Sequence, residues 1–195
     1  MSKKYKIGVY GSSAGDIAKI IPLAAEIGRQ LGRYSEAVIV ITGACSGLPY
    51  AAAKAASDLD TEVWGYSSSL DLDALKVEYP DDDVTIYKKL IYVPPEFTFS
   101  GRDLIRKKYR NIISTANCDA GILISGRWGT LNEFTNLIDF GKPVGVLTGT
   151  GGVADELPGL TKKVSKAGQG KIIFESDPVR LVDRLLKDLK ATKRL

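Results

Sequence analysis

The sequence predicts an α/β protein with a Rossmann-like, doubly wound, mostly parallel sheet and helices on both faces. Apolar segments, turns of glycine and small polar residues, and amphipathic segments follow one another repeatedly along the chain. The apolar segments are continuous rather than alternating, which is typical of parallel strands covered on both faces. The length of 195 residues fits one domain, so we expect residues 1–195 to form a single Rossmann-like nucleotide-binding domain.

Six apolar segments are the expected strands of this sheet. They are residues 6–10, 37–41, 62–64, 121–124, 144–147 and 171–174. Segment 67–99 is less regular and holds two weaker strand candidates, residues 84–87 and 90–93. We expect this segment to run over the carboxyl edge of the sheet, as a lid, an oligomer contact or a variable surface connection.

Amphipathic segments between the strands are the expected helices. They are residues 16 to about 32, 47 to about 57, 101–116 and 177 to about 191. The first has Asp16 as its N-cap and Gly32 at its end. The third starts at Ser100, with Asp103 completing a capping box. The stripe that the third helix is expected to bury consists of Ile105, Tyr109, Ile112, Ile113 and Ala116.

Composition excludes several classes of chemistry. The chain has no histidine, which removes Ser-His-Asp and Cys-His nucleophile systems, histidine acid–base catalysis and most zinc sites. The two cysteines, Cys45 and Cys118, lack metal-ligand spacing, so we expect reduced thiols and no metal site. Cys45 either lines a site or fills space in its turn. The net charge of +4 suits an anionic ligand and falls short of a nucleic-acid-binding signature.

Export and membrane insertion are not expected. Residues 1–5 lead into a strand pattern without the apolar stretch of a signal peptide. The longest apolar run, at residues 37–41, is far too short to span a bilayer. We therefore expect a cytoplasmic protein with no membrane partner.

Four glycine-rich turns follow expected strands, at residues 11–15, 42–47, 125–130 and 148–152. They should meet at the carboxyl edge, where ligands of doubly wound sheets bind at the reversal of strand order. Turn 125–130 leads into a helix, whose first N–H groups and positive dipole end form a phosphate site. The expected ligand contacts are Gly11, Ser12, Ser13, Gly43, Ala44, Gly126, Arg127, Trp128, Gly129 and Thr130. The two serines also fit a role as ordinary turn residues.

Two side chains are candidates for chemistry. Glu133 lies near where a ribose would sit if its phosphate occupied the turn, although Thr130-x-x-Glu133 is also a capping-box pattern. Arg110 lies on the flank of its helix's apolar stripe and could reach a phosphate, or it is a snorkelling surface arginine. Arg110 forms an i, i+4, i+8 row with Arg102 and Arg106. That row supports a remote alternative, nucleic-acid binding, but no basic surface interleaved with aromatic residues accompanies it.

Four segments resemble a known family. Val9-Tyr-Gly-Ser-Ser13, Thr42-Gly-Ala-Cys-Ser-Gly-Leu48, Arg110-Asn111 and Gly126-Arg-Trp-Gly-Thr-Leu-Asn-Glu133 occur in the order and spacing of the LOG ("lonely guy") superfamily. Members often carry a lysine decarboxylase label. Characterised members are phosphoribohydrolases that cleave nucleoside 5′-monophosphates, and a sister branch includes molybdenum cofactor carrier proteins.

The resemblance implies that Arg110 and Glu133 are the catalytic pair and that residues 126–130 hold phosphate. Three departures bring the chain closer to the carrier branch. Arg127 replaces the usual second glycine, Asn111 replaces a lysine, and Ala44-Cys45 interrupts a usual glycine triplet.

The expected function is therefore binding of a phosphorylated nucleotide-like ligand, as a nucleotide-binding or cofactor carrier protein. The ligand is a nucleoside monophosphate or a pterin-type cofactor. The alternative is a phosphoribohydrolase, in which Glu133 stabilises the oxocarbenium character of the ribose or orients water. A lysine decarboxylase is not expected, because no glycine-rich turn contains a lysine for a Schiff base and Lys142 precedes a strand. The resemblance also implies a homodimer or higher homo-oligomer.

Overall fold

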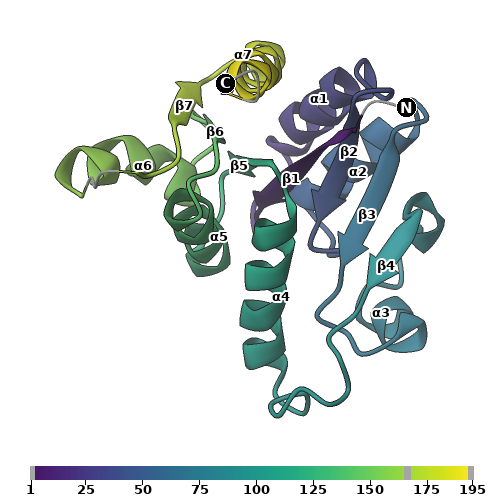
Figure 1. The fold of residues 1–195 in the computed structure, drawn as a ribbon. Coiled ribbons are helices and arrows are strands. Elements are labelled where there is room, and N and C mark those ends of the chain that lie inside the picture. The colour runs from purple at the N-terminus through teal and green to yellow at the C-terminus, as the bar shows by residue number, and fades with distance from the viewer. Residues whose placement is uncertain (1–2, 165–167, 193–195) are drawn as a thin grey trace.

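Seven parallel strands form one sheet in residues 3–164 and 168–192, the part of the chain that the computed structural model describes (Figure 1). The strands are β1 (Tyr5–Gly11), β2 (Val38–Thr42), β3 (Glu62–Tyr66), β4 (Lys89–Ile91), β5 (Ala120–Ile124), β6 (Val144–Leu147) and β7 (Ile172–Glu175). Their order is β4-β3-β2-β1-β5-β6-β7, and every neighbouring pair is parallel. The order therefore reverses between β1 and β5, where Gly11 pairs with Ile124 at the carboxyl ends. The predicted Rossmann-like α/β fold is confirmed.

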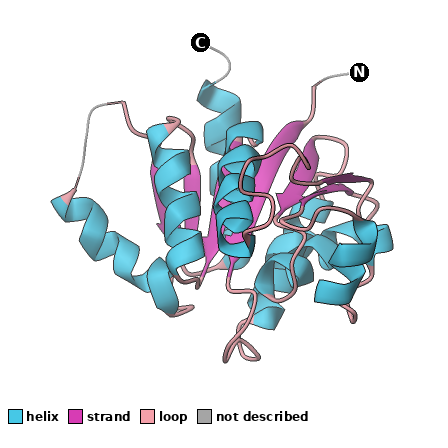
Figure 2. Cartoon of the chain, turned by 90° about the horizontal axis from the view of Figure 1, so that it is seen from below, coloured by secondary structure: helices cyan, strands magenta, loops and turns pink. Residues whose placement is uncertain are grey.

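Helices cover both faces of the sheet (Figures 1 and 2). They are α1 (Ile21–Gly32), α2 (Leu48–Ser57), α3 (Leu72–Glu78), α4 (Asp103–Asn117), α5 (Trp128–Asp139), α6 (Gly152–Lys163) and α7 (Pro178–Thr192). One core cluster packs α1, α2 and α7 against one face. A second cluster packs α5 and α6, with part of α4, against the other. Strands β1, β2 and β5 contribute buried residues to both clusters, which explains their continuous apolar sequence.

The start of α1 differs from the prediction. The helix begins at Ile21, so Asp16 is exposed and is not its N-cap. Pro22 explains the shift, because proline has no N–H and is tolerated only in the first turn of a helix. Residues 12–20 instead form an irregular passage along the carboxyl edge.

Segment 67–99 contains a helix that periodicity did not indicate. Helix α3 begins after Asp71, whose carboxylate accepts the N–H of Ala74 at 2.8 Å. The strand expected at residues 84–87 is wrong, because Val84–Ile86 forms a short 3₁₀ helix, η1, after a similar turn at Asp83. The strand expected at 90–93 is present as β4, one residue earlier in its start.

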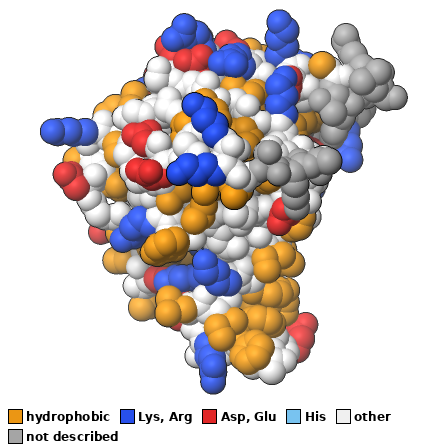
Figure 3. All heavy atoms as spheres, turned by 90° about the vertical axis from the view of Figure 1, so that its left-hand side faces the viewer, with side chains coloured by type: hydrophobic (Ala, Val, Ile, Leu, Met, Phe, Trp, Pro, Cys, Tyr) orange, Lys and Arg blue, Asp and Glu red, His pale blue; other side chains and the backbone are white. Residues whose placement is uncertain are grey.

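Helix α4 is turned differently from the prediction. Its N-cap is Arg102 without a side-chain cap bond, so the capping box at Ser100 is wrong. Its fully buried side chains are Asn111, Ser114 and Thr115, two of which bond back to the helix backbone. Of the expected apolar stripe, Ile105, Tyr109 and Ile113 are half-buried, whereas Ile112 is 46% exposed and Ala116 is exposed. Figure 3 shows the molecule from the left-hand side of Figure 1. Hydrophobic side chains gather near the bottom of this face, at the height of the loop before α4.

Candidate functional site

A cavity of about 620 Å³ opens at the carboxyl ends of β1, β2 and β5, where the strand order reverses. Most of the ligand contacts expected from the sequence line it: Gly11, Ser12, Ser13, Gly43, Arg127, Trp128, Gly129 and Thr130, together with Arg110 and Glu133. Turns separated by more than 80 residues in the sequence therefore share one cavity. Its size is within the usual range for small-molecule sites.

The N-terminus of α5 lines one side of the cavity. Ser125 and Gly126 both have positive φ values, 52° and 100°, which turn the chain sharply from β5 into the helix. The N–H groups of Trp128, Gly129 and Thr130 have no acceptor within their own helix, because they belong to its first turn. This end of the helix also carries the positive pole of the dipole. An anion that enters the cavity meets both.

Ser12 links this turn to the turn after β1. Its hydroxyl oxygen accepts the N–H of Gly126 at 3.1 Å, and its carbonyl accepts the N–H of Leu48 at the start of α2 at 3.0 Å. The buried serine thus holds three turns together, while its hydroxyl proton is left for a further acceptor. A structural and a ligand-binding role are compatible here.

The fourth glycine-rich turn lies behind the cavity and does not line it. Thr150 accepts the N–H of Ser125 at 2.9 Å, and the carbonyls of Ser125 and Gly126 accept N–H groups from the first turn of α6. Gly126 and Ala44 are also absent from the lining. Ala44 has a positive φ of 45°, and its side chain would meet a Cβ built on Gly65 of β3. The expected direct contact with Ala44 and Gly126 is therefore not what the geometry favours.

Arg110 reaches into the cavity rather than along the surface. A Cβ built on Gly43 would lie 1.4 Å from its Nη1 atom, so the guanidinium rests directly on this glycine. Its Nε atom is shielded from solvent and has no hydrogen-bond partner among the described residues. A buried donor without an acceptor is costly unless a ligand supplies one. Guanidinium geometry suits a phosphate or carboxylate.

Glu133 is buried in the same cavity, with 6% of its surface exposed. Helix α5 begins at Trp128, so Thr130 is its third residue and cannot be an N-cap, which excludes the capping-box interpretation. The described residues give the carboxylate no hydrogen bond or ion pair. Burial raises the pKa of Glu133 to about 7, although Arg110 and Lys108 act to lower it. The protonated form of this carboxyl therefore persists to a higher pH than that of an exposed glutamate.

Several lining residues were not expected from the sequence. Leu104, Lys107, Lys108 and Asn111 follow i, i+3, i+4, i+7 spacing on α4, so one face of this helix borders the cavity. Asn111 donates to the carbonyl of Gly129 at 3.4 Å and to Asn132 at 3.1 Å, which ties α4 to α5. The sequence contains this spacing, but the prediction for this helix followed the apolar residues of the expected buried stripe instead.

Four further lining residues come from other segments: Tyr10, Cys45, Pro49 and Tyr79. Burial raises the pKa of the Cys45 thiol, even though Arg110 lies close to it and acts to lower it. Cys45 therefore fits both interpretations: it is buried, as a space-filling residue would be, and it also lines the cavity. Tyr79 follows α3, and no sequence pattern pointed to it.

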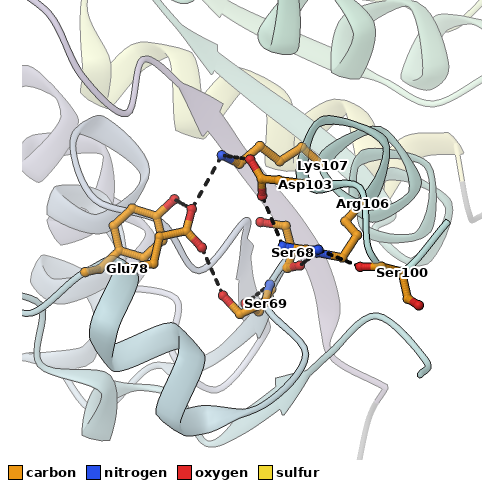
Figure 4. A network of polar contacts seen from close by, with 9 residues as sticks. Ser68, Ser69, Glu78, Ser100, Asp103, Arg106 and Lys107 are labelled. Atoms are coloured by element: carbon orange, nitrogen blue, oxygen red, sulfur yellow. Dashed lines mark hydrogen bonds and ion pairs between the residues drawn. The ribbon is translucent and has the colours of Figure 1, made fainter.

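A polar network joins segment 67–99 to α4 beside the cavity (Figure 4). Arg106 donates to the backbone carbonyls of Ser68 at 2.8 Å and Ser100 at 2.5 Å. Lys107 lies 2.8 Å from Asp103 and 3.4 Å from Glu78, which also accepts from the hydroxyl of Ser69 at 3.0 Å. Segment 67–99 therefore packs against α4. The arginines of this helix do not form one surface, because Arg106 binds backbone carbonyls beside the segment and Arg110 lines the cavity.

Asp119 and Lys142 lie at the amino edge of the sheet, away from the cavity. Asp119 accepts the N–H of Lys6 at 2.8 Å. Lys142 donates to the carbonyls of Thr115, Ala116 and Cys118 at the end of α4. It thus acts as a helix C-terminal cap, remote from any Schiff-base role. In residues 3–164 and 168–192 no group of three or more acidic or cysteine side chains is placed to hold a metal ion.

A family model described as "SLOG cluster4 family" matches residues 4–182 of the chain. This match bears out the resemblance found in the sequence. Comparison with curated proteins gave no match. Across the described part of the chain, no helix combines the length and apolar character needed to cross a membrane.

Solved structures share the fold over nearly the whole chain. The molybdenum cofactor binding protein from Rippkaea orientalis has a TM-score of 0.70 at 18% identity, covering 97% of this chain and 99% of that one. The molybdenum cofactor carrier protein from Chlamydomonas reinhardtii has a TM-score of 0.68 at 21% identity, with the same coverage. DNA processing protein A from Helicobacter pylori has a TM-score of 0.64 at 18% identity, covering 94% of this chain and 81% of that one.

Proposed function

Because the chain belongs to the SLOG cluster4 family, we propose that its cavity binds a phosphorylated nucleotide-like ligand, as a nucleotide-binding or cofactor carrier protein. One observation carries the proposal: three strand-to-helix turns and the first turn of α5 line one cavity with Arg110 and Glu133. Phosphate would accept from the free N–H groups of α5 and from Arg110. The whole chain would then act as a single nucleotide-binding domain.

The other end of the ligand would be a ring that donates hydrogen bonds. Glu133 offers a carboxylate without a described partner, and an amino group or ring N–H of a base or pterin would meet it. The unpartnered Nε of Arg110 also fits a bound anion. A pterin-type cofactor therefore suits these residues as well as a nucleoside monophosphate does, and the two structural neighbours named for molybdenum cofactor binding agree with it.

Hydrolysis is the second candidate function, and the buried Glu133 is the observation that favours it. A carboxyl with a pKa of about 7 can exchange protons near neutral pH. In this case the carboxylate would stabilise positive charge on the ribose as the base departs. Arg110 would hold the phosphate and could not act as the acid. No second carboxylate lines the cavity among the described residues to protonate the base.

Calorimetry with a panel of nucleoside 5′-monophosphates and a pterin tests the proposal, together with chromatography for released base. We expect saturable binding without release of base in the unmodified protein. Release that disappears in Glu133→Gln would establish the hydrolase instead. Lack of binding by every panel member, at concentrations up to about 1 mM, would refute both functions.

Nucleic acid and a second copy of the chain are the remaining partners to consider. The arginine row gives little support to nucleic acid, since Arg106 is occupied by backbone carbonyls and Arg110 points into the cavity. The neighbour from Helicobacter pylori is named for a single-stranded DNA binding mode, so an oligonucleotide at physiological salt belongs in the panel.

A homodimer or higher homo-oligomer would cover exposed apolar residues such as Ile112, and light scattering in solution tests it.

A further inference from the structure

The cavity carries more positive charge than one phosphate requires. Four cationic side chains line it, Lys107, Lys108, Arg110 and Arg127, against one carboxylate, Glu133, in the described residues. Lys107 is already compensated by Asp103 and Glu78. The other three are available to a ligand.

One phosphoryl group accounts for the inner part of this charge. A phosphate monoester carries about −1.5 to −2 at neutral pH. The N-terminus of α5 supplies roughly +0.5, and Arg110 on Gly43 supplies a full charge beside it. These two elements together nearly balance a single phosphate. Lys108 and Arg127 are then left over.

Lys108 and Arg127 are exposed, and their side chains have no described hydrogen bond or ion pair. The fold does not need an arginine at position 127, because its backbone is extended (φ −128°, ψ −154°) and its side chain makes no cap bond. Lys108 lies on the face of α4 that borders the cavity. Lys108 acts on Glu133 only through space, and no described contact occupies Arg127, so both charges are available at the cavity mouth.

The mouth also has room and a surface for a longer molecule. Trp128, next to Arg127, lines the cavity and is 80% exposed. An exposed indole beside cations stacks readily on a flat ring or sugar. The cavity volume of about 620 Å³ is in the middle of the range for small-molecule sites.

We propose that the ligand carries a second anionic group, which Lys108 and Arg127 bind at the mouth of the cavity. The ligand class is then a nucleoside diphosphate or a nucleoside with phosphates at both ends, rather than a nucleoside monophosphate. This inference rests on the proposed function of the cavity and specifies its substrate class.

Calorimetry on the full chain tests the inference with three ligands that share the base bound best in the monophosphate panel: the 5′-monophosphate, the 5′-diphosphate and the 3′,5′-bisphosphate. We expect one of the two ligands with a second phosphoryl group to bind about tenfold or more tightly than the monophosphate. Arg127→Ala and Lys108→Ala should each weaken binding of the doubly phosphorylated ligand several-fold more than binding of the monophosphate, so that most of the preference is lost.

Lys162→Ala is the matched control, because Lys162 is an exposed lysine on α6 outside the cavity and undergoes the same loss of charge. It should leave all three affinities unchanged. Equal binding of the three ligands, or equal losses for all of them in the two cavity variants, would overturn the second anion site and leave the proposed function standing. Failure of all three to bind would overturn the proposed function and this inference with it.

Discussion

Glu133 has surroundings that are unusual for a glutamate side chain, because it is buried in the cavity. It is a carboxyl on the buried side of α5, close to Arg110 yet without a described hydrogen bond. Burial penalises its charged form more than the neighbouring cations favour it. A buried carboxyl of this kind in a cavity is consistent with the function proposed for the site.

Stability should consequently depend on pH through Glu133. Between about pH 4.5 and 7 the unfolded chain ionises this carboxyl, whereas the native chain keeps it protonated. The native state then binds more protons, so the free energy of unfolding falls as pH rises through this window. Glu133→Gln should lack this fall and, relative to the unmodified protein, gain up to about 3 kcal/mol between pH 4.5 and 8.

Urea denaturation at a series of pH values measures this effect, with ligand absent. Glu36→Gln, on the exposed side of the loop after α1, is the control and should run parallel to the unmodified protein. Parallel curves for Glu133→Gln as well would mean that the carboxyl is solvated in the native state.

Gly43 should matter for ligand binding much more than for folding. An alanine there would place its Cβ 1.4 Å from Nη1 and 2.6 Å from Cζ of Arg110. The guanidinium is the end of a flexible side chain, so it can move aside with little strain. We expect Gly43→Ala to change the free energy of unfolding by less than about 1 kcal/mol and to weaken phosphate-ligand binding about tenfold or more.

Calorimetry with the best monophosphate ligand checks this expectation. Gly159→Ala is the control, since a Cβ there meets nothing within 4 Å and lies on α6. Unaltered affinity in Gly43→Ala would show that the ligand does not use the position that Arg110 now occupies.

Among the elements, α4 connects the two edges of the sheet. Its first turns border the cavity and hold segment 67–99 through Arg106, as Figure 4 shows. Its last turn lies at the amino edge, where Lys142 bonds three carbonyls that the helix leaves open. The cavity face of α4 is thus placed by contacts at both ends.

Lys142→Met should destabilise the protein without changing its site. The variant keeps most of the aliphatic stem but removes a charged donor from the negative end of the helix dipole. A loss of about 2 kcal/mol in the free energy of unfolding is expected, measured as a lower urea midpoint with an unchanged slope. Lys187→Met, at an exposed position of α7 before its last turn, should show no loss, and an equal loss there would assign the effect to general charge. A loss of ligand affinity in Lys142→Met would contradict the separation of the two edges.

The accuracy of the sequence predictions varied between elements for physical reasons. The central strands were visible because burial on both faces requires continuous apolar residues. Helix α1 was placed five residues early, since the apolar spacing before Pro22 is helical although the chain there is not. Helix α3 was missed because seven residues are too few for periodicity, and its signal was the N-cap Asp71. The rotation of α4 depends on tertiary packing of Ser114 and Thr115, which no local pattern reveals.

For the whole molecule, the topology of the sheet predicted where the candidate site lies better than it predicted which residues line it. The expectation of a parallel sheet predicted that the turns holding Gly11, Gly43 and Gly129 would share one edge, and all three line the cavity. The sequence could not show that the fourth turn does not line the cavity, because its position depends on hydrogen bonds between Thr150, Ser125 and the start of α6. The contribution of Tyr79 was equally hidden, since it follows from how segment 67–99 folds back.

The convergence of these turns on a phosphate is tested most directly by amide NMR shifts of the full-length, ¹⁵N-labelled chain during titration with the best monophosphate ligand. Saturable shifts should appear first at Trp128, Gly129 and Thr130, then at the turns around Ser12 and Gly43, while the amino edge stays unchanged. Shifts confined to the amino edge or to α6, or no saturable shift in the first turn of α5, would contradict the account.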